Sequence, residues 1–259
     1  MTTRIGILGT GHLAEFVIRG AAGKGFAFTV SPRSADRAAG LAQSHGVQIA
    51  RDNQALVDGV ALVLVALPAA EGLSILQGLR FRPDHSLLSA MAGVGAEALA
   101  AAVAPARVAI SMMPGLANAH GLGPCLLYPD RAEWRPFLSA LGPVHALPDE
   151  AHFATAASFG ALSGASFFWM EALIDWFCAR GLSPALARQL VAETLRGNAE
   201  VLLREAMPLD EIRRGIATPG GITELLVADL RQGAALDRWG QAMDLVLRRM
   251  TRPPATEVN

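Results

Sequence analysis

The sequence is poor in the residues on which several common kinds of protein chemistry depend. Its two cysteines, Cys125 and Cys178, lie far apart and show no metal-ligand spacing, which argues against a disulfide framework and a zinc cluster. Lys24 is the only lysine and lies between two glycines, so Schiff-base catalysis and a P-loop lack a credible lysine. No histidine follows His152, which removes most metal and Ser-His-Asp sites from the rest of the chain.

The chain also lacks a strong charge of either sign. Its 22 basic and 23 acidic residues give a formal net charge of −1, which leaves no electrostatic footprint for a nucleic acid or an anionic membrane. The first residues do not read as a signal peptide, so a cytoplasmic location is expected. The longest uncharged stretch, residues 153–170, reaches the length of a membrane span, but its hydroxyl side chains and glycines favour a buried helix or a subunit interface.

Apolar residues are abundant, at 52% of the 259 residues against 17% charged, which predicts extensive burial. The first half alternates short β-rich runs with alanine-rich helical patterns, the arrangement of βαβ units in a parallel sheet. We expect strands at residues 4–8, 26–31, 60–67, 86–91, 108–112 and 125–128, and helices from about residue 151, with one starting at Ser183-Pro184. The predicted domains are residues 1–148 and 149–250, joined within 141–150, and a flexible tail at 251–259.

A glycine-rich turn follows the first expected strand. Residues 9–14 read Gly-Thr-Gly-His-Leu-Ala, a G-x-G-x-x-A pattern between a strand and a helical stretch. Gly9 permits the tight turn, Gly11 lets the backbone approach a pyrophosphate, and Ala14 lets the helix pack closely on the strand. The helix N-terminus offers unpaired N–H groups to phosphates. The pattern therefore predicts a dinucleotide site formed by Gly9, Thr10, Gly11, His12 and Leu13, with a plain glycine-rich turn as the alternative.

The second expected strand ends without the acidic residue that holds the ribose hydroxyls in NAD-type sites. It ends in Ser31-Pro32-Arg33-Ser34, and a guanidinium with two hydroxyls suits a 2′-phosphate. We therefore expect Ser31, Arg33 and Ser34 to select NADPH over NADH. The alternative is that Arg33 is a solvated loop residue.

These motifs resemble the pyrroline-5-carboxylate reductase family, and the resemblance covers nearly the whole chain. The glycine loop is similar to that family's opening, and residues 31–34 look like its NADP-phosphate loop. Val65-Ala66-Leu67-Pro68 resembles the family's Ala-Val-Lys-Pro turn, and Ala90-Met91-Ala92-Gly93 resembles its next turn on the cofactor side. The resemblance implies further NADP contacts from Asn53, Val65, Ala66, Leu67, Pro68, Ala92 and Gly93.

The strongest resemblance lies in the helical half. Residues 217–223, Ala-Thr-Pro-Gly-Gly-Ile-Thr, look like the family's Ser-Pro-Gly-Gly-Thr-Thr signature. Such a loop can offer backbone N–H groups and two hydroxyls to a carboxylate, ahead of a helix expected near Glu224. In the family the helical domain dimerises and the substrate lies between this loop and the nicotinamide. The resemblance thus implies a homodimer or higher homo-oligomer, with the substrate bound by Thr218, Gly220, Gly221, Thr223 and Glu171.

Several of these assignments have simpler alternatives. The loop can be a helix–helix turn with Thr223 as the N-cap, and Glu171 can be a helix-interior acid paired with a neighbouring arginine. His120 is expected to be a solvated loop residue rather than a group at the nicotinamide end. The aromatic residues of the uncharged helix are expected in a core or a dimer interface rather than in a substrate box: Phe167, Phe168, Trp169 and Trp176.

The sequence also departs from the family. It has Met113-Pro114-Gly115-Leu116-Ala117 where the family has Met-Pro-Asn-Thr-Pro, and Leu67 replaces a lysine. Residues 159–165, Phe-Gly-Ala-Leu-Ser-Gly-Ala, carry more apolar bulk than the family's Ser-Gly-Ser-Gly-Pro-Ala-Tyr. These losses affect the substrate more than the cofactor, so a different cyclic or secondary imine is an open alternative.

The chemistry expected of such a protein is modest. The cofactor carries the hydride, while the protein holds the C=N carbon over the nicotinamide and excludes water. A protonated imine is already electrophilic, which agrees with a helical half without lysine or histidine. β-Hydroxyacid dehydrogenases resemble this architecture but depend on a lysine there. Thr223, as a hydrogen-bond partner of the imine nitrogen, is the candidate catalytic residue.

The sequence therefore predicts an α/β protein with an N-terminal Rossmann-type doubly wound parallel sheet and an all-α C-terminal dimerisation domain. We interpret it as an NADPH-dependent reductase of a cyclic imino acid, pyrroline-5-carboxylate to proline or a close analogue. An imine reductase for a biosynthetic intermediate and a non-catalytic NADPH-binding sensor or assembly protein are the alternatives. No metal, nucleic acid or membrane partner is expected.

Overall fold

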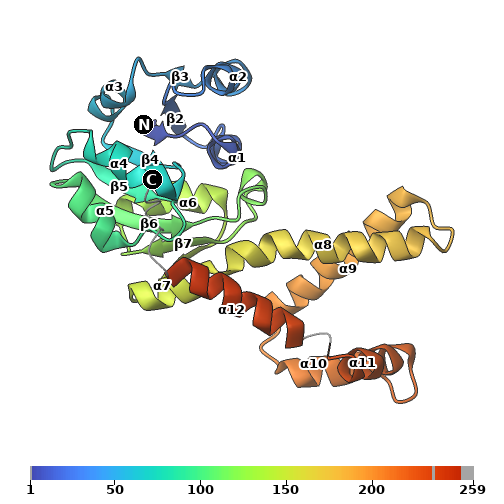
Figure 1. Cartoon of the computed structure of the whole chain (residues 1–259). Coiled ribbons are helices and arrows are strands. Elements are labelled where there is room, and N and C mark those ends of the chain that lie inside the picture. The colour runs from blue at the N-terminus through green and yellow to red at the C-terminus, as the bar shows by residue number, and fades with distance from the viewer. Residues whose placement is uncertain (1, 235–236, 252–259) are drawn as a thin grey trace, which may run out of the picture. The chain divides into compact units, whose positions relative to one another are not determined.

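A computed structural model describes residues 2–234 and 237–251. The described residues divide into two compact units, one formed by residues 2–160 and 246–251 and the other by residues 161–234 and 237–245 (Figure 1). Each unit is described by itself. The sequence domains 1–148 and 149–250 remain predictions, and the predicted tail lies, beyond Thr251, outside the described residues.

The first unit contains an eight-stranded sheet in the order β3-β2-β1-β4-β5-β6-β7-β8. The first six strands are parallel, β7 is antiparallel to β6, and β8 is parallel to β7. The predicted doubly wound parallel sheet is therefore confirmed, with an antiparallel step at one end. The strands are β1 (Thr3–Leu8), β2 (Phe26–Val30), β3 (Gln48–Ile49), β4 (Leu62–Val65), β5 (Ser86–Ser89), β6 (Arg107–Met112), β7 (Cys125–Tyr128) and β8 (Val144–Ala146).

Two of these strands were not expected from the sequence. β3 has two exposed residues, too few for a period-2 pattern to appear. β8 lies within residues 141–150, which were expected to be a domain junction, yet Cys125, Leu126 and Leu127 of β7 pair with its three residues. Residues 144–146 of the expected junction therefore extend the sheet.

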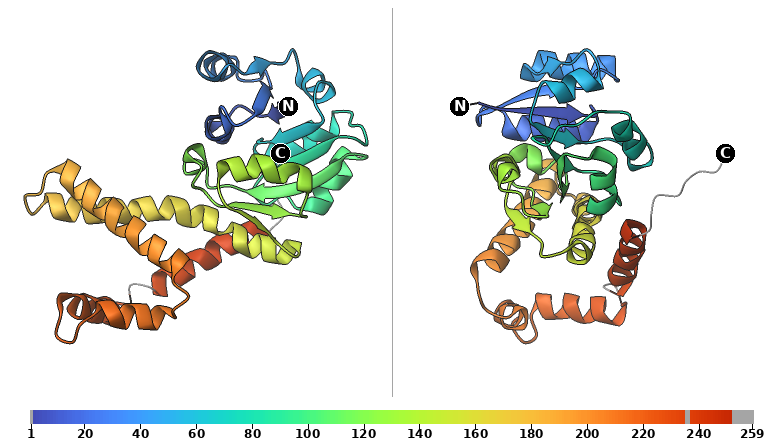
Figure 2. Two further views of the ribbon diagram at one scale, coloured as in Figure 1. Left: turned by 180° about the vertical axis from the view of Figure 1, so that it is seen from behind. Right: turned by 90° about the vertical axis from the view of Figure 1, so that its left-hand side faces the viewer.

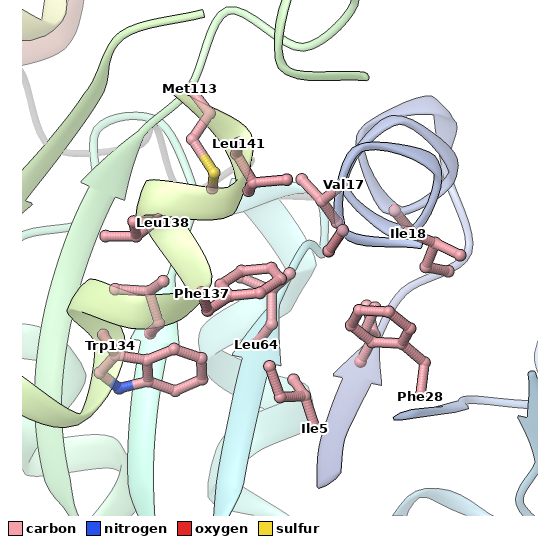
Figure 3. Packing of buried hydrophobic residues seen from close by; sticks show 14 of the residues in the cluster. Ile5, Val17, Ile18, Phe28, Leu64, Met113, Trp134, Phe137, Leu138 and Leu141 are labelled. Carbon is pink, nitrogen blue, oxygen red and sulfur yellow. The ribbon is translucent and has the colours of Figure 1, made fainter. Parts of the chain in front are cut away.

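Helices cover both faces of the sheet (Figures 1 and 2). One core cluster joins one face to α1 (His12–Ala21), α2 (Ala35–His45) and α6 (Arg135–Leu141). Figure 3 shows its centre, where Phe137 and Leu141 of α6 and Val17 of α1 meet Ile5 and Leu64 of the strands. The second cluster packs on the other face, beneath α3 (Asn53–Asp58), α4 (Ala69–Gln77), α5 (Ala96–Val103) and α7 (Glu150–Ala157).

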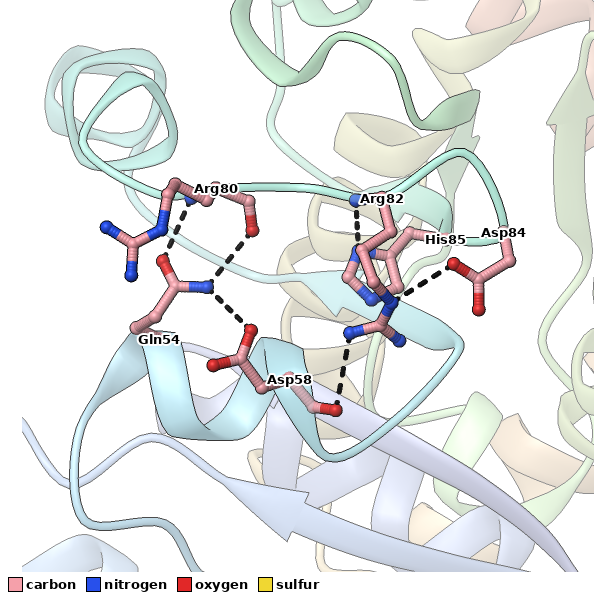
Figure 4. A network of polar contacts seen from close by, with 6 residues as sticks. All are labelled: Gln54, Asp58, Arg80, Arg82, Asp84 and His85. Carbon is pink, nitrogen blue, oxygen red and sulfur yellow. Dashed lines mark hydrogen bonds and ion pairs between the residues drawn. The ribbon is translucent and has the colours of Figure 1, made fainter.

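A polar network braces the amino-terminal edge of the sheet (Figure 4). Gln54 of α3 receives the Arg80 N–H at 2.9 Å and donates to Asp58 at 2.8 Å. The Arg82 N–H donates to Nδ1 of His85 at 3.1 Å. His85 is fully buried, and its Nε2 has no hydrogen-bond partner among the described residues. This edge is the one opposite the glycine loop, so the network supports the sheet and not the predicted site.

The helices from residue 159 onward are α8 (Phe159–Cys178), α9 (Pro184–Arg204), α10 (Leu209–Ile216), α11 (Ile222–Gln232) and α12 (Asp237–Thr251). The predicted start at Ser183-Pro184 is confirmed, because the Ser183 hydroxyl accepts the Leu186 N–H at 3.3 Å and Pro184 opens the helix. Within residues 161–234 and 237–245, the buried side chains are Ala187 and Val191. This unit thus has almost no core of its own.

The uncharged helix was expected to be either buried or part of a subunit interface, and it is not buried. α8 contains no buried residue, and Phe167, Phe168, Trp169 and Trp176 are all exposed. The helical stretch Glu150–Cys178 contains an 18-residue window with a mean hydropathy of 1.2 and is long and apolar enough to cross a bilayer by length and composition, which is weak evidence taken alone. Coverage by another subunit is the remaining expectation.

Candidate active site

A pocket of about 550 Å³ opens at the carboxyl ends of the central strands. The strand order reverses between β1 and β4, and such a switch point is where open α/β sheets bind ligands. The pocket collects most of the predicted cofactor residues, which come from the turns after β1, β2 and β4 and from the start of α3: Gly9, Thr10, Gly11, His12, Leu13, Ser31, Arg33, Ser34, Asn53, Ala66, Leu67 and Pro68.

The glycine loop has the geometry that a dinucleotide needs. Gly9 has a φ of +104°, and a Cβ at this position would collide with the Ala66 carbonyl oxygen. A Cβ on Gly11 would meet no protein atom within 4 Å, so there is room for a ligand against this part of the backbone. Gly11 is the N-cap of α1 and makes no side-chain cap, which leaves the first N–H groups of the helix open to phosphate oxygens. The residues present fit a pyrophosphate.

Ser31 takes a different place from the one expected. Its side chain is buried, and its hydroxyl accepts the Gly9 N–H at 3.0 Å. The hydroxyl therefore holds the glycine loop against the end of β2. Ser34 is exposed at the N-cap of α2 and makes no side-chain cap, which leaves its hydroxyl available at the pocket.

The expected phosphate-binding arginine already has a partner. Nη1 of Arg33 lies 2.8 Å from Oε2 of Glu71, in the first turn of α4. Both side chains are more than half exposed and both line the pocket. Arg37 of α2 lines the same pocket and has no ion-pair partner among the described residues.

Three predicted cofactor residues lie outside this pocket. Val65 is fully buried in β4. Ala92 and Gly93, which follow β5, line a separate cavity of about 440 Å³ together with Met112 and Glu150. Oε1 of Glu150 accepts the Ala96 N–H at 2.9 Å and so caps α5.

Four residues that line the 550 Å³ pocket were not predicted. They are Arg37, Glu71, Ile75 and Ala90. Arg37 is four residues from Arg33, and this helical spacing could have identified it. Glu71 and Ile75 share that spacing, but their place at the pocket depends on how α4 packs.

The turn after β6 is held by a buried asparagine. Oδ1 of Asn118 accepts the Gly115 N–H at 2.9 Å, and its Nδ2 donates to the Gly123 carbonyl at 2.8 Å. A polar anchor thus remains where the family's Met-Pro-Asn-Thr-Pro is lost, although it faces the interior. Burial raises the pKa of the neighbouring Cys125 thiol to about 12, which makes a nucleophilic role untenable. His120 is exposed, as expected.

The loop at residues 217–223 forms a cradle whose central N–H groups are already occupied. Gly220 has a φ of +72°, and its N–H donates to the Glu224 carboxylate at 2.6 Å. The Gly221 N–H donates to the Thr218 carbonyl at 2.9 Å. α11 begins at Ile222 with Gly221 as its N-cap, so the alternative that made Thr223 the N-cap is wrong, and the helix starts two residues before the expected position.

Thr223 and Glu171 are placed differently within the helical unit. Thr223 lines a mainly apolar cleft of about 490 Å³ with Leu202 of α9 and with Ile212, Arg213 and Ile216 of α10. Glu171 lies exposed on α8 and outside this cleft. It has no ion pair in the part of the chain that the structure describes, so the expected arginine partner is not found there. Thr218 and Gly220 are exposed and are not among the residues that line the cleft.

No cluster of histidine, cysteine, aspartate and glutamate that could hold a metal occurs among the described residues. The donors at both candidate sites are backbone N–H groups, hydroxyls and arginines. This donor set suits anionic phosphates and carboxylates.

Two family models match the chain. The model described as "Pyrroline-5-carboxylate reductase dimerisation" matches residues 150–252, and "NADP oxidoreductase coenzyme F420-dependent" matches residues 4–93. Pyrroline-5-carboxylate reductase 3 of Xenopus laevis is 26% identical over 244 residues, covering 88% of this chain and 88% of its own. This chain is a divergent relative of the pyrroline-5-carboxylate reductase family. The family resemblance expected from the sequence is confirmed.

Solved structures of the reductase family share the fold. The pyrroline-5-carboxylate reductase of Streptococcus pyogenes superposes with a TM-score of 0.87 at 21% identity, covering 96% of this chain and 98% of its own. That of Plasmodium falciparum, solved with NADP bound, gives a TM-score of 0.83 at 18% identity and covers 96% and 97%. The match to the reductase family's dimerisation model also supports homo-oligomerisation of this chain.

Proposed function

We propose that this relative of the pyrroline-5-carboxylate reductase family uses NADPH to reduce the C=N bond of a cyclic imine. The observation that carries the proposal is the open glycine loop at the switch point of the sheet, in a chain whose helical half matches the reductase family's dimerisation model. Pyrroline-5-carboxylate, which gives the relatives their name, is the first candidate substrate.

The pocket at the switch point would hold the cofactor. The N–H groups at the start of α1 would bind the pyrophosphate, and Arg33, Ser34 and Arg37 lie where a 2′-phosphate can be bound from the end of β2 and the first turn of α2. Asn53, Ala66, Leu67 and Pro68 would form the walls. Val65 would act through the position of β4, and Ala92 and Gly93 through the turn that separates this pocket from the neighbouring cavity.

The loop at residues 217–223 would bind the substrate. Thr218, Gly220, Gly221 and Thr223 remain the proposed contacts, with Glu171 as a further one, and the substrate carboxylate would take the Gly220 N–H from Glu224. Thr223 lines a cleft, which supports its hydroxyl as the proposed partner of the imine nitrogen. The proposal requires this loop and the glycine loop to meet at one crevice, within a chain or across a homodimer.

NADPH would supply a hydride to the carbon of the protonated imine, the C=N π electrons would pass to the nitrogen, and the products would be the neutral secondary amine and NADP+. The chain's own groups orient the C=N carbon and exclude water. The wall of the pocket near β5 is lined by Ala90, and Leu67 takes the place of a charged residue, so this region supplies shape and not a proton donor. No proton donor is needed during hydride transfer, because the nitrogen of the protonated imine already carries its proton.

A homodimer through the helical unit is the proposed assembly. The apolar side chains of α8 and α9 are exposed along their length, including Phe168, Trp169, Leu202 and Leu203, and an apolar surface of this extent marks an interaction site. The cytoplasm remains the proposed location.

An anaerobic assay of NADPH oxidation tests the function. Pyrroline-5-carboxylate, pyrroline-2-carboxylate, the carboxylate-free 1-pyrroline and an open-chain imine form the panel. We expect turnover of at least one cyclic imine, with the secondary amine as product. Tight NADPH binding without turnover of any of them would contradict the proposal and favour a sensor or assembly protein.

A substitution at Thr223 tests the catalytic assignment. Thr223→Val keeps the shape of the side chain but removes the hydroxyl, so kcat should fall about tenfold or more while the NADPH dissociation constant stays the same. Ile222→Val, at the adjacent exposed position, is the matched control and should leave kcat unchanged. Equal kinetics for Thr223→Val and the wild type would remove Thr223 from the reaction.

A further inference from the structure

An acidic side chain lies at the part of the cofactor pocket where a 2′-phosphate would bind. Glu71 contacts Arg33 with an Nη1–Oε2 distance of 2.8 Å, and both residues line the pocket that contains the glycine loop. The two side chains are 63% and 54% exposed for Arg33 and Glu71, so neither is held there by burial. The contact joins residues 38 positions apart, from the loop after β2 to the first turn of α4.

The ion pair between Arg33 and Glu71 lowers the affinity of the pocket for a phosphate. An incoming 2′-phosphate needs the guanidinium that Glu71 occupies, and the carboxylate repels it at short range. Phosphate is the stronger partner, since it carries more charge and more acceptor oxygens. Arg37 lies one helical turn after Arg33 on α2 and lines the same pocket, so a second guanidinium is at hand once the phosphate has displaced the carboxylate.

The Glu71 carboxylate favours the binding of a cofactor that lacks the 2′-phosphate. NAD-type sites use an aspartate or glutamate at the end of the second strand to accept hydrogen bonds from the ribose hydroxyls. That position has no acid here, because the strand runs into residues 31–34, Ser-Pro-Arg-Ser. Glu71 brings a carboxylate to the same part of the pocket from a different element, α4.

We propose that Glu71 is a specificity-determining residue that lets this pocket accept NADH as well as NADPH. With NADPH, the 2′-phosphate takes Arg33 and Arg37 and Glu71 turns away; with NADH, Glu71 stays and accepts from the ribose hydroxyl. Glu71 thereby reduces the ratio of NADPH affinity to NADH affinity, which Arg33 raises. The inference rests on the proposed function, since it takes this pocket as the cofactor site.

Calorimetric titration of the full-length protein tests the inference without any need for turnover. The ligands are NADP+ and NAD+, and the fragments adenosine 2′,5′-bisphosphate and 5′-AMP, which differ in the 2′-phosphate alone. Glu71→Gln should bind NADP+ and the bisphosphate more tightly, and NAD+ more weakly, so that the NADP+/NAD+ affinity ratio rises about tenfold or more. Arg33→Ala should change this ratio in the opposite direction.

Glu97→Gln is the matched control. Glu97 is likewise an exposed acid in the first turn of a helix, α5, but it does not line the pocket. Its substitution removes the same charge and should leave the affinity ratio unchanged.

The possible outcomes separate the inference from the function on which it rests. An unchanged ratio in Glu71→Gln would overturn the inference, and so would weaker NADP+ binding, which would mean that Glu71 braces Arg33 for the phosphate. In both cases the wild type still binds a nicotinamide cofactor and the proposed function stands. If the wild type bound neither dinucleotide, the proposed function and the inference would fall together.

Discussion

The sheet unit buries its large apolar side chains, whereas the helical unit leaves many of them exposed. The sheet unit packs two clusters against its two faces and fully encloses Trp134, Leu64 and Leu88. In the helical unit Phe168 is 75% and Leu203 81% exposed, and the buried residues are small or β-branched. The sheet unit therefore has the core that a stable domain requires, while the helical unit needs a surface from outside the unit to remove its apolar side chains from water.

The backbone cradles of the two units differ as well. In the sheet unit a Cβ on Gly11 would meet no protein atom within 4 Å, and the loop is open to a ligand. In the helical unit the Gly220 N–H is taken by the Glu224 carboxylate. The glycine loop is open to an anion, whereas the loop at residues 217–223 can offer the Gly220 N–H to an anion only after the Glu224 carboxylate leaves it.

The largest expected effect concerns the core of the sheet unit. Phe137 is 1% exposed and packs edge-on against Phe28 and Trp134, so Phe137→Ala should lower the free energy of unfolding by about 3–5 kcal/mol. Urea unfolding followed by circular dichroism measures this. Leu122→Ala, at a 76% exposed position of the same unit, should stay within about 0.5 kcal/mol of the wild type. Similar losses for the two variants would mean that the sheet unit does not have a self-sufficient core.

The next effect concerns the surface of the helical unit. Phe168→Asp should weaken self-association about thirtyfold or more, or roughly 2 kcal/mol, because a buried aromatic anchor of an interface would be replaced by a charge. Sedimentation velocity over a range of concentrations measures the association constant.

Leu122→Asp is the control for that variant, since Leu122 is 76% exposed and belongs to the sheet unit. It should leave the association unchanged. If Leu122→Asp weakened the association and Phe168→Asp did not, the interface would lie on the sheet unit and not on the helical unit.

The occupied cradle gives a third prediction. Glu224→Gln removes a negative charge from the Gly220 N–H, so KM for pyrroline-5-carboxylate should fall about tenfold, while KM for 1-pyrroline, which has no carboxylate, should not change. Steady-state kinetics with the two imines makes the comparison within a single protein. An equal shift for both imines would show that Glu224 shapes the loop and does not compete with a substrate carboxylate.

The smallest effect is a pH dependence within the sheet unit. Burial, with a smaller contribution from the charge of Arg82, lowers the pKa of His85. The unfolded chain therefore takes up this proton first, and the free energy of unfolding should fall as the pH drops below about 6.5. Urea titrations between about pH 7.5 and pH 5.5 should show a steeper loss for the wild type than for His85→Gln. Parallel curves would mean that folding does not lower the pKa of His85.

Local patterns in the sequence were sufficient to predict the sheet and the cofactor loop. A strand, a glycine turn and a helix follow one another within residues 3–21, so the conformation of Gly9 and the opening of α1 need no distant information. The longest strands, β1, β2 and β6, were predicted for the same reason. β3 and β8 were not, because two- and three-residue strands form through pairing with a neighbour.

The parts of the candidate site that were not predicted depend on long-range contacts. The sequence identified Arg33 but not Glu71, which meets it through the packing of α4 on the sheet. It identified the loop at residues 217–223 but not the contact of Glu224 with Gly220, since a glutamate four residues along reads as an ordinary first-turn acid. Neither residue belongs to the motif next to it, yet each lies against the group that the motif supplies.

The most direct test of the account is a crystal structure of the oligomer with NADPH and proline, the saturated product analogue. The account predicts that the nicotinamide and the ring of proline are in contact, with the turn after β1 at one end of the ligands and Gly220 to Thr223 at the other, from the same chain or from two. If the helical loop faced away from the cofactor in every subunit of the assembly, the account would be contradicted.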